Sequence, residues 1–320
     1  MVVAAPLLYG CAGSESATAR ATPSSPATVS GSPIAVTPSP PAPPTQRGET
    51  PLPVALEEAA AASAGGRLYV IGGFDAAGDS LRTVWVFDGS AWRAGPRLPL
   101  GLDHTSAATL GDRIYIAGGH SFGRDSARVF RLDGSTWTEL APMHHARGGH
   151  TLLAAMGRLY AIGGNTAAAN VAPVEVYDPV AGAWSDLTSL PTPRNHVAGF
   201  VLGNSVCAAG GRSPTRTRVD CFDLDSSAWV RLPDLPTATS GAGAAALNDG
   251  RVVIMGGQDA QETNIVNRAE LLGASAWAAL GPMLVPRHGF ELAPFDGRAW
   301  ACGGGSLPGL HPVAACTSIG

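Results

Sequence analysis

The chain has 320 residues, of which 45% are hydrophobic and 14% charged, with a formal net charge of −4 and a pI of about 6.0. This balance excludes the globally basic surface that attracts nucleic acid, so we expect no nucleic-acid partner. The apolar content and the 41 glycines are typical of a turn-rich globular protein and exclude a chain that is disordered throughout.

The opening segment, MVVAAPLLYGC (1–11), resembles a shortened bacterial lipoprotein signal. A short apolar run ends at Gly10 and Cys11, and in such signals the cysteine after a small residue is acylated. The alternative is an unmodified Cys11 in a disordered leader. No run of 18 apolar residues predicts a spanning helix. We therefore expect membrane contact only through a lipid anchor at Cys11, and a location in the bacterial cell envelope outside the cytoplasm.

The next segment, residues 12–44, consists almost entirely of Ser, Thr, Pro, Ala and Gly. It has too little apolar surface to offset the loss of chain entropy on folding, so we expect a disordered tether. The predicted organisation is a truncated lipoprotein-like signal at 1–11, a linker at 12–44 and a folded domain at 45–320.

A repeat of 45 to 47 residues dominates the remainder of the chain. Its most regular mark is a glycine pair that occurs six times, at 72–73, 118–119, 163–164, 210–211, 256–257 and 303–304. A tryptophan follows each of the first five pairs by 19 to 21 residues, at Trp92, Trp137, Trp184, Trp229 and Trp277. Units of this size cannot bury a core alone, so they must stack on one another.

Each unit contains four short apolar segments separated by turn residues. In the third unit these are HTLLAAM (150–156), RLYAIGG (158–164), VEVYD (174–178) and AWSDL (183–187). Tight turns with glycine separate them, as antiparallel hairpins require. Four antiparallel strands per unit, repeated radially, predict an all-β fold, a six-bladed β-propeller.

The glycine pair that closes the second strand, an aromatic–Asp step in the third strand, such as Tyr177-Asp178, and the tryptophan of the fourth strand resemble the kelch-repeat family. The resemblance extends from about residue 46 to the end of the chain. The sixth unit lacks a fourth strand. Leu52-Pro53 matches Leu98-Pro99 at an offset of 46, so we predict that Thr45 to Glu49 completes the last blade and closes the ring.

Four cysteines lie on the predicted second and third strands of two blades, and the members of each pair are 14 residues apart. Because these strands are antiparallel neighbours, each pair could face across its sheet. We predict the disulfides Cys207–Cys221 and Cys302–Cys316, which fit an oxidising compartment. The alternative is four buried thiols that act as small hydrophobic residues.

Four histidines, His104, His150, His196 and His288, stand at a similar interval before the glycine pairs at 118–119, 163–164, 210–211 and 303–304. We expect them at similar places at the start of the innermost strands, near the central channel, where they hydrogen bond between blades. The alternative is a ring of metal ligands. No carboxylate or cysteine joins these histidines at ligand spacing, so we predict no metal site.

Galactose oxidase, a copper enzyme, contains a kelch propeller, so the resemblance raises the same cofactor here. Its site uses tyrosines. Here Tyr69, Tyr115 and Tyr160 each stand three residues before a glycine pair and belong to the repeat itself. We therefore expect no cofactor.

Loops between the second and third strands of a propeller lie on the same face as the entries to the first strands, and loops held by a rigid scaffold usually carry binding. An arginine cluster in the fourth blade suits the carboxylates of a glycan or an acidic protein loop. The alternative is a solvated charged loop. The candidate ligand-binding residues are Arg147, Arg194, Arg212, Arg216, Arg218, Arg287 and His120.

We expect a monomeric, extracytoplasmic binding module that recognises a protein or a carbohydrate at this loop-rich face. The alternative is a carbohydrate-active enzyme similar to the sialic-acid mutarotase, a six-bladed kelch propeller. That chemistry needs an acid–base carboxylate beside an arginine. Glu262 and Arg268 are the candidates for these roles, unless they are simply two solvated loop charges.

Overall fold

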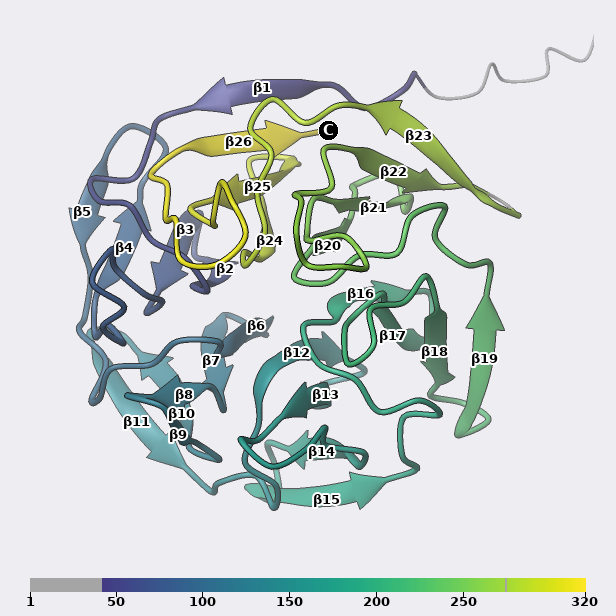
Figure 1. The fold of residues 1–320 in the computed structure, drawn as a ribbon. Coiled ribbons are helices and arrows are strands. Elements are labelled where there is room, and N and C mark those ends of the chain that lie inside the picture. Colours follow the sequence, from purple (N-terminus) through teal and green to yellow (C-terminus); the bar gives the residue numbers. More distant parts are fainter. Residues whose placement is uncertain (1–41, 274) are drawn as a thin grey trace, which may run out of the picture. The chain divides into compact units, whose positions relative to one another are not determined.

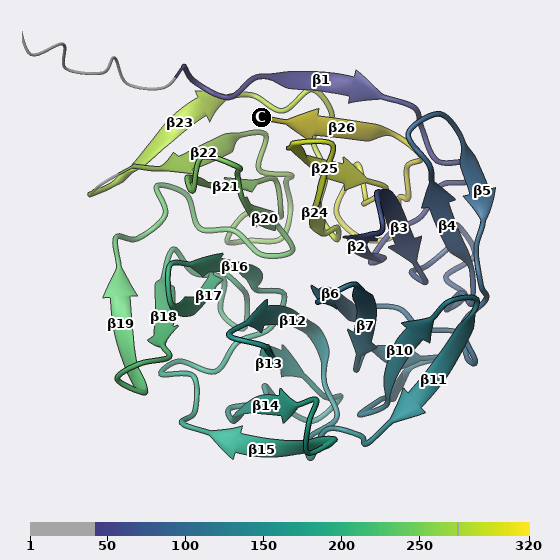
Figure 2. The ribbon, with the colours of Figure 1, turned by 180° about the vertical axis from the view of Figure 1, so that it is seen from behind.

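Six four-stranded antiparallel sheets surround one central axis in a computed structural model that describes residues 42–273 and 275–320 (Figure 1). Figure 2 shows the same ring from behind. The predicted six-bladed propeller is confirmed. The predicted signal, Cys11 and all but the last residues of the predicted linker lie outside the described residues. Within the described residues, no helix is long and apolar enough to span a membrane.

The first three blades contain the following strands, given from the axis outward. Blade one has β2 (Ala60–Ala64), β3 (Arg67–Ile71), β4 (Val84–Phe87) and β5 (Trp92–Ala94). Blade two has β6 (Ser106–Leu110), β7 (Arg113–Ala117), β10 (Val129–Asp133) and β11 (Thr136–Leu140). Blade three has β12 (Gly148–Ala155), β13 (Arg158–Asn165), β14 (Val174–Asp178) and β15 (Ala183–Leu187).

The other three blades repeat this order. Blade four has β16 (Ala198–Leu202), β17 (Ser205–Ala209), β18 (Val219–Asp223) and β19 (Ala228–Leu232). Blade five has β20 (Gly243–Ala246), β21 (Val252–Met255), β22 (Ala269–Leu272) and β23 (Trp277–Gly281). Blade six has β24 (Leu292–Phe295), β25 (Arg298–Cys302), β26 (Cys316–Ile319) and β1 (Gln46–Glu49). A small hairpin, β8 (His120–Ser121) with β9 (Arg124–Asp125), stands apart from blade two.

The ring closes through β1, as the sequence predicted. This strand pairs antiparallel with β26, so that Gln46 lies opposite Ile319 and Glu49 opposite Cys316. In Figure 1 the purple β1 lies along the yellow β26. The segment from the start of the folded unit thus supplies the outer strand of the last blade, and it covers an edge that would otherwise be unpaired.

The glycine pairs join neighbouring blades. In every pair the first glycine has φ between 60° and 76°. The N–H of the second glycine donates to a carbonyl of the next blade at 2.8–3.0 Å, from Gly73 to Leu102 in blade two and so on around to Gly304, which donates to Leu56. A Cβ on the first glycine would lie within 3.0 Å of that same carbonyl oxygen. Both the backbone angle and the close approach therefore require glycine.

The tryptophans join the outer strands of neighbouring blades. Four of the five predicted tryptophans donate from Nε1 at 2.8–3.0 Å to a carbonyl just after the fourth strand of the preceding blade. Trp92 makes this bond to Thr50, directly after β1, so the closing strand is used like any other fourth strand. Trp229 is the exception, because its buried Nε1 has no partner.

Both predicted disulfides are present. Cys207 faces Cys221 across β17 and β18, and Cys302 faces Cys316 across β25 and β26. Each bond therefore joins the second and third strands of one blade.

Replacing Gly163 by alanine tests the role of the glycine pair, with Gly157→Ala as the control. Both glycines have a left-handed φ, of 72° and 73°, which costs alanine about 1–2 kcal/mol. Only at Gly163 would the new Cβ also meet a carbonyl, that of Arg194 at 2.7 Å. We expect Gly163→Ala to lower the free energy of unfolding by about 1–3 kcal/mol more than the control. Urea denaturation measures this difference, and equal losses would contradict the assigned role.

Candidate functional site

Six residues, one from each blade, form a closed circle of backbone hydrogen bonds at the mouth of the central channel. The N–H of each residue donates to the carbonyl of the previous one at 2.5–3.0 Å, in the order Glu58, His104, Gly149, His196, Gly241, Gly289 and back to Glu58. All six have φ between 50° and 67°. We call this circle the mouth ring.

Three members of the mouth ring are not glycine, although the backbone favours glycine there. Glu58, His104 and His196 have φ of 52°, 50° and 52°. A left-handed conformation costs a residue with a Cβ about 1–2 kcal/mol. Blades three, five and six avoid this cost by using glycine. Side chains held in such a conformation are candidates for function, because the fold alone is satisfied by glycine.

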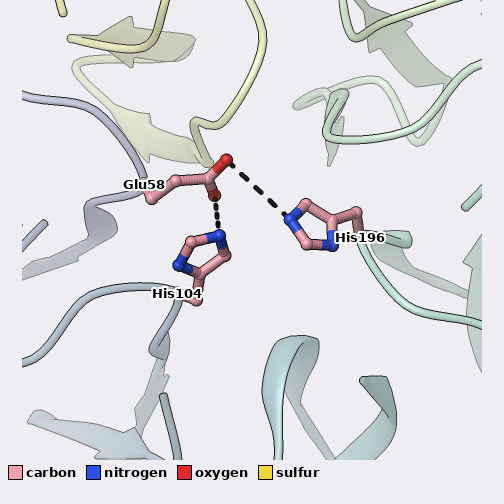
Figure 3. Close-up of side chains that lie close together, drawn as sticks. All are labelled: Glu58, His104 and His196. Atoms are coloured by element: carbon pink, nitrogen blue, oxygen red, sulfur yellow. Dashed lines mark ion pairs between the residues drawn. The ribbon is translucent and has the colours of Figure 1, made fainter. Parts of the chain in front are cut away.

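The three side chains converge above the channel (Figure 3). Glu58 lies between the two imidazoles, with its carboxylate oxygens 3.8 Å from His104 Nε2 and 3.9 Å from His196 Nε2. The two imidazole rings meet edge to face, with their centroids 5.0 Å apart. Radial packing thus brings together three residues from blades one, two and four.

The residue before each histidine orients its ring. Asp103 Oδ1 lies 2.7 Å from His104 Nδ1, and Asn195 Oδ1 lies 2.6 Å from His196 Nδ1. Because these oxygens accept, each Nδ1 carries a proton and donates. For a neutral ring, the lone pair is then on Nε2, the atom that faces Glu58.

Two of the predicted ligand-binding residues flank this cluster. Arg212 places Nη2 at 3.0 Å from His196 Nε2 and donates from Nη1 to Glu262 at 2.8 Å. His120 contacts the ring of His104 edge to face, with a centroid distance of 5.3 Å, and lies 3.1 Å from Asp125. The structure therefore brings Arg212 and His120 to the mouth.

Charges at the mouth shift the pKa of its histidines in opposite directions. Burial alone would lower the pKa of His104, but Glu58 and Asp103 outweigh it and raise that pKa above its usual value. Burial, followed by the positive charge of Arg212, holds the pKa of His196 well below the usual range. The mouth thus pairs a histidine that favours the charged form with one that stays neutral.

The channel beneath the mouth is a narrow cavity of about 110 Å³. Its wall contains Glu291, which accepts hydrogen bonds from the Ala61 N–H at 2.8 Å and from Ser106 Oγ at 2.5 Å. Burial raises the pKa of Glu291 to about 7, against the opposing effect of these donors. A carboxyl group that changes charge near neutral pH therefore lies below the mouth.

Three predicted ligand-binding arginines are placed elsewhere. Arg147, Arg194 and Arg287 have no exposed surface. Each donates to the carbonyl of the first glycine in the pair of its own blade. In the two blades that offer a carboxylate there, Arg147 pairs with Glu175 and Arg194 with Asp220. Because their donors are used inside the blades, we correct the expectation that these three arginines contact a ligand.

The remaining predicted residues lie on the loop side without forming one group. Arg218 binds Asp220 through its guanidinium, and Arg216 has a buried Nε without a hydrogen-bond partner. Glu262 and Arg268, proposed as an acid–base pair, have other partners. Glu262 pairs with Arg212, whereas Arg268 donates to Thr237 and lies 3.7 Å from Glu270.

Glu58 was missed by the sequence reasoning, although a signal for it exists. Counting back 14 residues from the first glycine of a pair reaches Glu58, His104 and His196 alike. The four histidines were expected at similar places, but His150 is one position closer to its pair and His288 is one position farther away. A shift of one residue turns a side chain in another direction. His150 accordingly has two buried ring nitrogens without partners, and His288 pairs with Glu57 at 3.2 Å.

A family model described as the KLHDC2/KLHL20/DRC7 Kelch-repeats domain matches residues 41–211, more than half of the chain. The chain belongs to the kelch-repeat family. Kelch-like protein terF of Aspergillus terreus is 28% identical over 188 residues, which are 53% of this chain and 41% of that protein. Human Kelch repeat and BTB domain-containing protein 13 is 31% identical over 158 residues, which are 49% and 34% of the two chains.

The chain spans less than half the length of these kelch relatives. Among solved structures, that of YjhT superposes with a TM-score of 0.71 at 17% identity, covering 84% of this chain and 99% of YjhT. At this identity the likeness concerns the fold alone.

Replacing Glu291 by glutamine should reduce the pH dependence of stability. The folded-state pKa of about 7 lies above the ordinary value of 4.5, so the contribution of Glu291 is fully present below about pH 4.5 and is lost as the pH rises through 7. Glutamine keeps an acceptor for the Ala61 N–H without a charge. Between about pH 5 and 8 we expect the melting temperature of Glu291→Gln to change less than that of the wild type, by at least about 2–4 °C. Parallel melting profiles would contradict this.

Proposed function

We propose that this kelch propeller is an extracytoplasmic binding module that recognises a protein or a carbohydrate partner at its loop-rich face. That face is formed by the loops between second and third strands, which pair with the entries to the first strands through bridges such as Asp103–His120 and Asn195–Arg212. The mouth ring lies at its centre. A protein partner is favoured by one observation, the exposed Phe122.

Phe122 occupies the tip of the β8–β9 hairpin and is 69% exposed. With Gly123 it forms the turn, and the two residues have φ of 49° and 75°. An aromatic residue in the left-handed conformation is unfavourable by itself, and so is the exposure of its ring to water. Aromatic side chains of this kind are the usual anchors of protein interfaces, where they fill a pocket of the partner.

The hairpin is held in place before any partner arrives. The Phe122 N–H donates to Ser80 Oγ at 2.9 Å, and that hydroxyl donates to Asp103 at 2.5 Å. On the other strand of the hairpin, Asp125 accepts from the N–H of Ala167 in blade three at 3.0 Å. A preorganised loop loses less entropy on binding, which favours affinity.

Other side chains on this face complement such an anchor. Leu307 and Leu310 in the long loop of blade six are 55% and 39% exposed. Arg212 and Arg216 lie in the loop of blade four, where their charges suit acidic groups on a partner. Apolar anchors beside charged groups are typical of protein interfaces.

Two features support a location outside the cytoplasm. The two disulfides form and persist in oxidising compartments. The composition of residues 12–44 suits a tether between a lipidated Cys11 and the propeller. We propose a monomer that meets its partner at the cell surface.

Replacing Phe122 by alanine tests this function, with Val180→Ala as the matched control. Val180 is 96% exposed and lies in the turn between β14 and β15, on the opposite face. Loss of a central aromatic anchor should weaken partner binding at least about tenfold. Full chains immobilised side by side are screened with cell-envelope extracts and glycan arrays. A partner captured equally by Phe122→Ala, or lost in Val180→Ala, would contradict the proposal.

A second candidate function is carbohydrate chemistry of the mutarotase or epimerase type. It is favoured by the pair of Glu262 and Arg212, which supplies the required carboxylate beside an arginine on the loop face at 2.8 Å. We expect Glu262→Gln to abolish any sugar isomerisation while leaving protein capture intact, with Glu139→Gln as control, because Glu139 makes an exposed pair with Arg128. NMR of free sugars with the full chain measures turnover. Turnover that is unchanged in Glu262→Gln would remove this candidate.

A further inference from the structure

We propose that Glu58, His104 and His196 form a binding site for one divalent transition-metal ion, zinc foremost, at the mouth of the channel. Two imidazole nitrogens and one carboxylate oxygen are a ligand set that zinc accepts. Three protein ligands leave a fourth position for water or for a group of a bound ligand. The site does not depend on the identity of the partner proposed above.

The ligand atoms are spaced for a shared ion. His104 Nε2, His196 Nε2 and a Glu58 oxygen all lie within 4.8 Å of one another. The separations of 3.8 and 3.9 Å between imidazole and carboxylate exceed a hydrogen bond. Two ligands on one tetrahedral zinc, with bonds of about 2.0–2.1 Å, are about 3.3–3.4 Å apart. An inward movement of about half an ångström therefore completes the geometry.

The outer contacts of the two histidines are those of metal ligands. A metal-bound imidazole usually donates its other N–H to a carboxylate or carbonyl oxygen, which fixes the tautomer and the ring orientation. Asp103 does this for His104 at 2.7 Å, and Asn195 does it for His196 at 2.6 Å. Both partners directly precede their histidine, so blades two and four solve the same problem in the same way.

The backbone of the mouth ring supplies independent support. Glycine serves at this position in three blades, so Glu58, His104 and His196 are not needed to close the circle of hydrogen bonds. All three residues nevertheless retain an unfavourable φ, and these same three side chains converge. Strain confined to the converging residues indicates that their side chains are retained for what they bind.

Two other groups of potential ligands are less suitable. In the group of Glu57, Glu58 and His288, His288 Nε2 is already 3.0 Å from the Leu307 carbonyl and 3.2 Å from Glu57. In the group of His144, Glu175 and Asp186, Glu175 belongs to the buried ion pair with Arg147 at 2.7 Å. Among the histidines of these described groups, only His104 and His196 combine an occupied Nδ1 with an Nε2 that faces Glu58.

Arg212 competes with the ion. Its Nη2 lies 3.0 Å from His196 Nε2, the lone pair that a metal requires, and its positive charge repels a cation. Glu262 already accepts from Nη1 at 2.8 Å and offers a place for the guanidinium to move to. Removal of Arg212 should therefore strengthen metal binding, whereas removal of any of the three ligands should weaken it.

Glycine substitutions provide the sharpest test, because glycine is already used at this ring position by the other blades. The full chain in a Cys11→Ser background, which removes a free thiol that also binds zinc, is stripped with chelator and titrated calorimetrically with ZnCl₂. We expect one bound ion. Glu58→Gly, His104→Gly and His196→Gly should each weaken it at least about tenfold without lowering the melting temperature of the metal-free protein. Arg212→Gln should tighten binding.

The double variant His144→Ala/His145→Ala is the control, because it removes exposed histidines near the other candidate group. It should bind zinc as the parent does. Failure of the parent to bind zinc, wild-type affinity in His104→Gly/His196→Gly, or loss of binding in the control would each overturn the proposal. X-ray absorption of the parent gives a reading that needs no variant. Two imidazole ligands support the site, and any other histidine count contradicts it.

Discussion

The contact on which this propeller depends is the hydrogen bond from the second glycine of each pair to a carbonyl of the next blade. It occurs at all six blade boundaries, including the last, where Gly304 donates to Leu56. The approach is so close that a Cβ on the first glycine would collide with the same carbonyl oxygen. Each blade is thereby fixed to its neighbour at one point near the axis, and the tryptophan of the fourth strand fixes most blades at a second point near the rim. Two contacts at different radii set the angle between blades, so the ring has little freedom to open.

The mouth ring follows from this constraint. Once the glycine pairs hold adjacent blades together, the residues that enter the first strands are carried to a common circle, and their backbone groups bond one to the next. His104 and His196, which stand one and three repeats after Glu58 in the sequence, thus become its neighbours. A site assembled in this way needs no long insertion. It needs only that a few blades carry a functional side chain where the others carry glycine.

The repeat allowed prediction of the fold because its marks report backbone requirements that recur in each blade. Glycine pairs, tryptophans and the Leu-Pro match identified the blades, the closing strand β1 and the disulfides, all of which depend on register within one unit. The site depends on comparing different units at one-residue precision. The four histidines were treated as equivalent although their intervals to the glycine pairs are not identical, which hid the difference between the ring residue His104 and the buried His150. The buried arginines misled for a related reason. Their charge suggests a surface role, whereas the carbonyls they satisfy are visible only in three dimensions.

The loop face divides chemically into a polar centre and an apolar periphery, and this division bears on how a partner is recognised. Phe122, Leu307 and Leu310 are exposed in the loops, where apolar contact gives affinity with little demand on geometry. At the centre, Glu58, His104 and His196 are oriented by hydrogen bonds and strained backbone, which suits a ligand of defined charge and shape. Arg212 links the two regions, since it contacts His196 at the mouth and Glu262 in the loop of blade five. Any ligand or ion that displaces this guanidinium from His196 also disturbs the pair with Glu262. Occupation of the mouth is therefore coupled to the arrangement of the neighbouring loops through one side chain.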